Sequence, residues 1–234
     1  MENILLRYMV ERFNLEQDEK KKVVQLPFIT ISREFGCPAK DVATMIIERL
    51  NTEYEKTKNF IPWTTISKEV LMAASEELHI DQSKIKRVFN DEKRGVIDEI
   101  LNAFSEKYYY SDRKILKTID KVILDFAHKG NVVIVGRGGM AVTRELPLGL
   151  HVRLFAPISW RIQQLMDAGI CKTMEEARKV SEQIDFKRNE LLKSKSKTSY
   201  SYKDDFDVYY NCKYLSVEEI TTSVINLLRI KKFI

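Results

Sequence analysis

Two patterns of apolar positions alternate along the chain: short β-prone runs and longer stripes with helical spacing. An uninterrupted apolar run at residues 132–135 predicts a fully buried parallel strand. The β-prone, mainly apolar residues 28–31 and 150–156 predict two further strands. Residues 206–210 predict one more strand near the end of the chain. Strands that alternate with helices are typical of an α/β fold, and the helical stripes occupy most of the remaining chain.

The helical stripes connect and flank these strands. They cover residues 1–20, 38–50, 67–78, 79–90, 91–110, 111–128, 159–166, 172–192 and 216–231. Residues 51–59 are polar and predict a linker, and Phe60 to Trp63 predict an aromatic entry to the next helix, with Trp63 in the core. Residues 193–203 hold four lysines and two tyrosines. This composition favours a solvated basic loop, and a loop that closes on phosphates is the alternative.

Composition narrows the class of protein only modestly. The chain has 234 residues, 44% of them hydrophobic, and a net charge of +5 with lysines interspersed among acidic residues. This balance permits an anionic small substrate and argues against nucleic acid as the partner. Three scattered cysteines without a C-x-x-C motif, and an N-terminus typical of neither a signal peptide nor a membrane span, favour the cytoplasm. The N-terminal amphipathic helix packs on its own chain or forms a homodimer contact.

The first candidate site is the turn between the strand at 28–31 and the helix that follows it. This turn contains Gly36 and Pro38, and Lys40 stands in the first turn of the expected helix. The free N–H groups and positive dipole end of such a helix attract an anion, and Lys40 can reach the same anion. The loop lacks the G-x-x-x-x-G-K-[ST] motif, so an ordinary strand-turn-helix without a ligand is the alternative.

The second candidate site is the Gly-Arg-Gly-Gly turn that follows the strand at 132–135. Ligands of open α/β sheets collect at the carboxyl ends of the strands, and an arginine fork pairs bidentately with phosphate. Arg137 is therefore the first choice for an oxyanion contact. A structural arginine paired with a carboxylate is the alternative. The three histidines are too dispersed to form a metal cluster.

Taken in order, the motifs resemble the cytidylate kinase-like family of P-loop proteins. They are ISREFG with Lys40, VVIVGRGG, LHVRLFAP with Arg161, EEARK with Asp185 and Arg188, and FDVYYNCKYLSVEEI. The resemblance implies a helix-rich, three-layer α/β/α fold with a P-loop NTPase-like parallel sheet. It implies a domain at residues 23–234, with a helical insertion at about 64–128 and a lid-like segment at about 170–205, preceded by a separate helix at 1–22.

The resemblance also implies an ATP-dependent phosphotransferase that uses Mg²⁺ and acts on a nucleoside monophosphate such as CMP. Catalytic roles are expected for Lys40, Arg137, Arg161 and Arg188. The ATP phosphates are expected over Gly36, Cys37, Pro38, Ala39, Lys40 and Asp41, with Asp41 at the metal. Substrate contacts are expected from Arg33, Glu34, Arg137 and Asp185, and Lys195 or Lys197 are expected to contribute from a closing loop.

Two alternatives to a kinase stay open. Pro38, Ala39 and Gly138 stand where the family usually has other residues, which favours a degenerate nucleotide- or phosphate-binding regulatory protein on the same fold. Asp185 and Arg188 are three residues apart on one helix and are also consistent with a simple surface pair. The second alternative to a kinase is nucleic-acid binding by residues 193–203, which requires an affinity that depends strongly on salt.

Overall fold

The structure is a computed structural model that describes residues 26–57, 60–66, 113–195 and 202–234. The expected helices at 1–20, 67–78, 79–90 and 91–110 lie outside the described residues, as does most of the proposed helical insertion.

Five parallel strands form one sheet at the centre of the described chain. Their order is β2-β3-β1-β4-β5. The strands are β1 (Phe28–Arg33), β2 (Thr64–Ile66), β3 (Val132–Val135), β4 (Gly149–Phe155) and β5 (Val208–Asn211). Since all pairings are parallel, the carboxyl ends of the strands share one edge of the sheet, and β1 lies in the middle of that edge.

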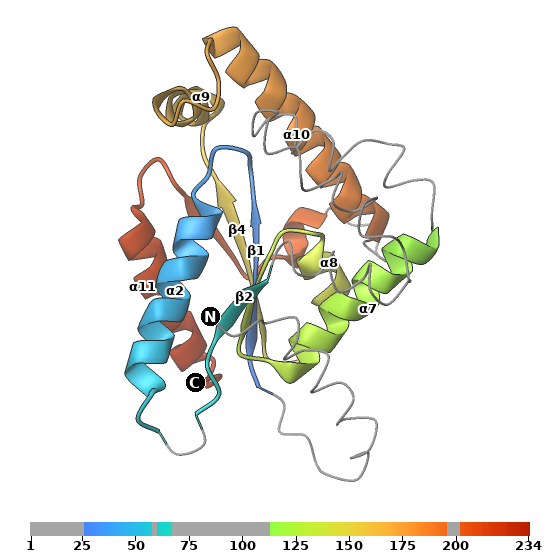
Figure 1. The fold of residues 1–234 in the computed structure, drawn as a ribbon, viewed down its shortest axis with the longest axis vertical. Helices are drawn as coiled ribbons and strands as arrows, with labels where there is room; N and C mark the ends of the chain where they lie inside the picture. Colours follow the sequence, from blue (N-terminus) through green and yellow to red (C-terminus); the bar gives the residue numbers. More distant parts are fainter. Residues whose placement is uncertain (1–25, 58–59, 67–112, 196–201) are drawn as a thin grey trace.

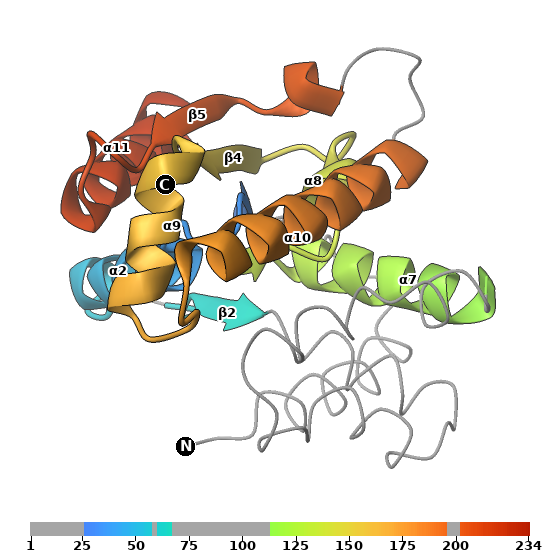
Figure 2. The same ribbon diagram turned by 90° about the horizontal axis from the view of Figure 1, so that it is seen from above.

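Helices cover both faces of the sheet, which confirms the predicted three-layer α/β/α architecture (Figure 1). On one face lie α2 (Ala39–Tyr54) and α11 (Val217–Ile230), and on the other lie α7 (Arg113–Lys129) and α8 (Gly139–Thr143). Beyond the carboxyl edge are α9 (Ile158–Asp167) and α10 (Met174–Lys195), while a short 3₁₀ helix spans Tyr202–Asp205. Seen from above, α10 runs across the molecule over this edge (Figure 2).

Alternate residues of the central strands build two separate cores. Ile29 and Ile31 are fully buried against α2 and α11, while Phe28 packs with Val132 and Ile134 against α7. Both faces of a parallel sheet are covered by helices, so its strands consist of continuous apolar runs. The predicted strands at 28–31 and 132–135 are therefore confirmed.

The predicted linker at residues 51–59 is wrong over its first four positions, because α2 continues to Tyr54. Asn51 provides the reason. Its amide donates to the Trp63 carbonyl over 3.1 Å and accepts from the Trp63 N–H over 2.7 Å. The polar residue thus ties the last turn of α2 to the entry of β2, and Trp63 lies in the core as expected. β2 has only three residues and was not expected from the sequence.

None of the described helices is long and apolar enough to cross a membrane.

His151 lies inside the sheet on β4 and is 1% exposed. Its Nδ1 is 2.8 Å from the hydroxyl of Thr30 on the neighbouring strand, and its ring packs edge-on against Phe28. Burial lowers the pKa of His151 from 6.5 to about 4, and the nearby Asp207 opposes this only in part. The histidine is therefore a neutral core residue.

We expect the burial of neutral His151 to make the fold sensitive to acid. Between pH 6.5 and about 4 the unfolded chain holds a proton on this ring that the folded protein does not. This contribution is fully present above pH 6.5 and is lost as pH falls toward 4, by up to about 3 kcal/mol. Urea unfolding across this range measures the effect. His151→Gln should flatten the slope, whereas His128→Gln, at an exposed site on α7, should leave it unchanged.

Candidate functional site

The loop between β1 and α2 has few free backbone N–H groups. The Phe35 N–H donates to Asp185 Oδ1 over 2.7 Å, and the Cys37 and Ala39 N–H groups donate to carbonyls within the loop. Pro38 has no N–H and caps α2 without a side-chain hydrogen bond. The N–H groups of Lys40 and Asp41 have no acceptor within the helix, because they lie in its first turn. Free N–H groups of this loop are thus found at the start of α2.

Arg33 ends β1 at the centre of the carboxyl edge. Its Nη1 lies so close to Gly136 that a Cβ there would be 2.0 Å away. Glycine is therefore required at 136 for the guanidinium group to reach this position. Among the described residues, no side chain makes an ion pair or hydrogen bond with the Arg33 guanidinium group.

The glycine turn after β3 has an unusual backbone. Gly136, Arg137 and Gly138 all have positive φ, at 78°, 58° and 73°. Such a conformation is uncommon for a side chain as large as arginine, and backbone strain of this kind gathers at functional sites. The turn places the positive charge of Arg137 near that of Arg33. This is the edge of the sheet that the sequence predicted for Arg137.

Arg188 of α10 and Arg153 of β4 complete a cluster of four arginines. Arg188 Nη1 donates to the Arg33 carbonyl over 3.2 Å, and its guanidinium group lies 5.8 Å from the centre of the Phe35 ring. Arg153 is 7% exposed, and its Nη2 is 3.3 Å from the amide oxygen of Asn189. Sequence reasoning missed Arg153 because it lies within an apolar strand, where a lone arginine carries no motif.

The positive charges of this cluster lie close enough to affect one another. Burial, followed by the charges of Arg188, Arg137 and Arg153, lowers the pKa of Arg33 well below its ordinary value, and Asp185 alone opposes this. Burial lowers the pKa of Arg188 to about 10, again against Asp185. An anion bound here would relieve the repulsion between the arginines.

Arg161 of α9 is engaged differently, since it contacts four protein oxygens. Its Nε donates to the Ala156 carbonyl over 2.9 Å and lies 3.3 Å from Glu34 Oε2. Its Nη1 donates to the Phe35 carbonyl over 3.0 Å and to Asp185 Oδ2 over 2.6 Å. This buried ion pair joins the ends of β1 and β4 to α9 and α10.

The two carboxylates of this network bind protein groups on both sides. Asp185 accepts from Arg161 and from the Phe35 N–H, and lies 3.9 Å from Arg188. Glu34 accepts from the Ala156 N–H over 3.1 Å. Asp185 is therefore far more than the partner in a surface pair with Arg188, because it links α10 to the loop after β1.

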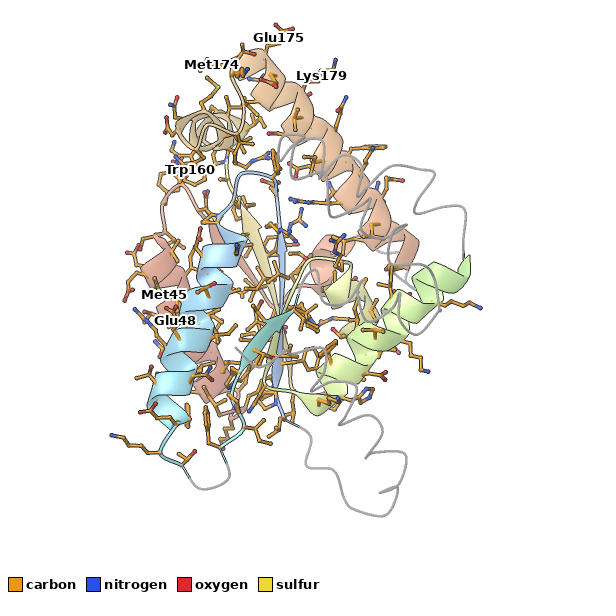
Figure 3. The ribbon with its side chains drawn as sticks, viewed as in Figure 1. Met45, Glu48, Trp160, Met174, Glu175 and Lys179 are labelled. Atoms are coloured by element: carbon orange, nitrogen blue, oxygen red, sulfur yellow. The ribbon has the colours of Figure 1, made fainter. Side chains whose placement is uncertain are left out.

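The other expected site residues lie at the rim or farther away. Lys40 and Asp41 are exposed in the first turn of α2. Lys195 lies in the last turn of α10, where its stem packs against Gly138 and its amine pairs with Asp120 of α7. Lys197 lies outside the described residues. The first turns of α10 project away from the sheet, as the outward-pointing Met174, Glu175 and Lys179 show (Figure 3).

The described residues contain no group of three or more His, Cys, Asp or Glu side chains placed to hold a metal ion. A magnesium ion bound together with phosphates needs only one or two protein carboxylates. Asp41 stays the candidate for that role.

The fold and the site together define an α/β protein with a parallel sheet, a loop after β1 and an arginine cluster at the carboxyl edge. Residues 28–214 match the sequence profile of the cytidylate kinase-like family. The chain belongs to this family.

A solved structure shows the same fold. An uncharacterized protein from Eubacterium ventriosum superposes with a TM-score of 0.59 at 15% sequence identity, over 88% of this chain and 99% of that one. No curated protein matches the chain.

Substitution of Arg161, which pairs with carboxylates, and of Arg33, which lies among other arginines, should affect the free energy of unfolding differently. Arg161→Met leaves the buried Asp185 carboxylate without its main partner and should lower the free energy of unfolding by about 3–5 kcal/mol. Arg33→Met removes a charge from a cluster of like charges and should leave stability unchanged or raise it. Urea denaturation measures both. A large loss of stability in Arg33→Met would show that Arg33 is a structural arginine.

Proposed function

We propose that this protein is an ATP-dependent phosphotransferase whose acceptor is a nucleoside monophosphate, CMP-like, or another small phosphorylated compound. The observation that carries the proposal is the cluster of Arg33, Arg137, Arg153 and Arg188 at the carboxyl edge of the sheet, with Asp185 as the one opposing charge near Arg33. Membership of the cytidylate kinase-like family supports a nucleotide kinase-like activity.

The residues present fit phosphate groups at two neighbouring places. The start of α2 offers the N–H groups of Lys40 and Asp41, the amine of Lys40 and the positive end of the helix dipole. The arginine cluster offers guanidinium forks to a second anion. Two phosphate positions at neighbouring strand ends along one edge of the sheet suit a donor and an acceptor.

Phosphoryl transfer asks a protein mainly for positioning and charge neutralisation. Mg-ATP would supply the phosphoryl group, with Asp41 as the carboxylate for the metal. Lys40 would neutralise the donor phosphates, while Arg33 and Arg137 would hold the acceptor phosphate and Arg188 would approach it from α10. We assign Arg161 to positioning, because its contacts are with protein oxygens.

A second candidate function is phosphate or nucleotide binding without catalysis, as in a regulatory protein. The composition of the loop between β1 and α2 favours this second function. Pro38 has no N–H, and the N–H groups of Phe35, Cys37 and Ala39 already have protein acceptors. Fewer backbone donors are left for a donor phosphate than a glycine-rich loop offers.

Purified protein should convert a monophosphate to a diphosphate when it is incubated with Mg-ATP and a panel of nucleoside monophosphates. Lys40→Ala should abolish turnover, and Arg33→Met should reduce kcat/KM by about 100-fold or more, since a guanidinium contact to phosphate is lost. Arg178→Met is the matched control, because Arg178 is exposed on α10 and pairs with Glu182.

Calorimetry separates the two candidate functions. Binding of Mg-ATP or phosphate without turnover would establish the regulatory reading. Unchanged activity in both Lys40→Ala and Arg33→Met would remove these residues from the mechanism. Neither binding nor turnover would overturn both proposals.

A further inference from the structure

Two of the three cysteines meet at the candidate site. Cys37 lies in the middle of the loop between β1 and α2, and Cys212 directly follows β5. β1 pairs with β4 and β4 pairs with β5, so both cysteines lie at the carboxyl edge of the sheet. Their separation by 175 positions along the chain concealed this proximity in the sequence.

The two cysteines belong to one packed region. Cys212 is 5% exposed in the core between the sheet, α2 and α11, and the more exposed Cys37 packs against the same core. Each thiol shifts the pKa of the other, which agrees with this placement of the two side chains as neighbours. The Cys212 N–H also donates to the Phe155 carbonyl over 2.9 Å, which fixes Cys212 to the end of β4. One partner is thus held by the sheet and the other belongs to the loop.

We propose that Cys37 and Cys212 form a reversible disulfide in the presence of a small hydroperoxide, and that this bond restrains the loop from Glu34 to Asp41 against the end of β5. The site is a redox modification site that lies within the candidate phosphate loop. The proposal concerns the two thiols and the loop, and it holds whether or not the protein is a kinase.

The chemistry starts at Cys212. The neighbouring Cys37 thiol lowers the pKa of Cys212, and the Cys212 thiol raises the pKa of Cys37, so we assign the first thiolate to Cys212. The Cys212 thiolate attacks one peroxide oxygen, the O–O bond breaks, and hydroxide leaves. Cys212 is now a sulfenic acid, oxidised by two electrons, and the peroxide is reduced.

Cys37 completes the reaction. Its sulfur attacks the Cys212 sulfur, the S–O bond breaks, and the released hydroxide takes up the Cys37 proton as water. The sum is two thiols and one hydrogen peroxide giving one disulfide and two waters. A dithiol reductant returns both thiols by exchange through a mixed disulfide.

The disulfide should change the loop because bonded sulfur atoms lie closer together than two thiols in contact. Cys212 is held in the core, so most of the movement falls on Cys37 and its neighbours. The loop would be drawn toward β5 and away from the arginine turn after β3. Gly36 packs closely on the backbone of Arg161, where a Cβ would lie 3.1 Å away, so this displacement also reaches the start of α9.

Hydrogen peroxide treatment of the full chain tests the proposal. Peptide mapping by mass spectrometry should show a cross-link between Cys37 and Cys212 that dithiothreitol reverses, in the wild type and equally in the control Cys171→Ser. Amide hydrogen exchange over residues 34–41 should become slower in the oxidised protein. In Cys37→Ser, Cys212 should persist as a sulfenic acid and react with dimedone, while in Cys212→Ser the dimedone adduct on Cys37 should be absent.

A missing 37–212 cross-link in wild-type protein would overturn the proposal, as would a cross-link that leaves exchange over 34–41 unchanged. A dimedone adduct on Cys37 in Cys212→Ser would overturn the assigned order of oxidation. None of these measurements uses a nucleotide. If the kinase proposal fails while this proposal holds, the protein will show no turnover but will still form the cross-link. The wild-type cross-link also keeps the test independent of how well the serine variants fold.

Discussion

The buried ion pair between Arg161 and Asp185 holds the carboxyl edge of the sheet together. Through it, α9 and α10 are attached to the ends of β1 and β4, and the loop after β1 is fixed at Phe35 from both its N–H and its carbonyl. A pair of this kind contributes little net stability compared with an apolar contact, but breaking it leaves a buried charge without a partner. The main effect of the ion pair is on geometry, because it fixes the position of α10 and therefore of Arg188.

That attachment is what permits the arginine cluster. Four guanidinium groups near one another repel, and the fold keeps them in place through Gly136, which makes room for Arg33, and through the strained backbone at Arg137. Repulsion between like charges adds no stability to a fold, and such clusters are typical of functional sites, which supports the proposal of an anionic ligand here. Arg161, paired with Glu34 and Asp185, thus serves as the frame of the site. The arginines around Arg33 are the part of the site that we propose to bind an anion.

The sequence predicted the architecture well where the periodicity was strong. The long apolar runs located β1, β3 and β4, and the capping box at Ser216 located the start of α11. It failed at β2, whose three residues are too short for a pattern. The entry of β2 depends on the side chain of Asn51, which lies 12 positions earlier in the chain than its partner Trp63. Of the four clustered arginines, the sequence analysis had singled out Arg33, Arg137 and Arg188. It missed Arg153 and the meeting of Cys37 with Cys212, because both depend on which strands are neighbours in the sheet.

The composition of the loop after β1 determines which groups could bind an anion in the proposed site. A glycine-rich phosphate loop binds mainly through backbone N–H groups, which have fixed directions and partial charges. Here Pro38 lacks an N–H and the Phe35 N–H is held by Asp185, while full positive charges stand beside the loop on other elements. In the proposed site, recognition of an anion would therefore depend less on the loop backbone than on side chains of β1, β3, β4 and α10. A site built this way depends on the closeness of α10 and on the position of the loop, which is why a covalent bond at Cys37 would act on the whole site.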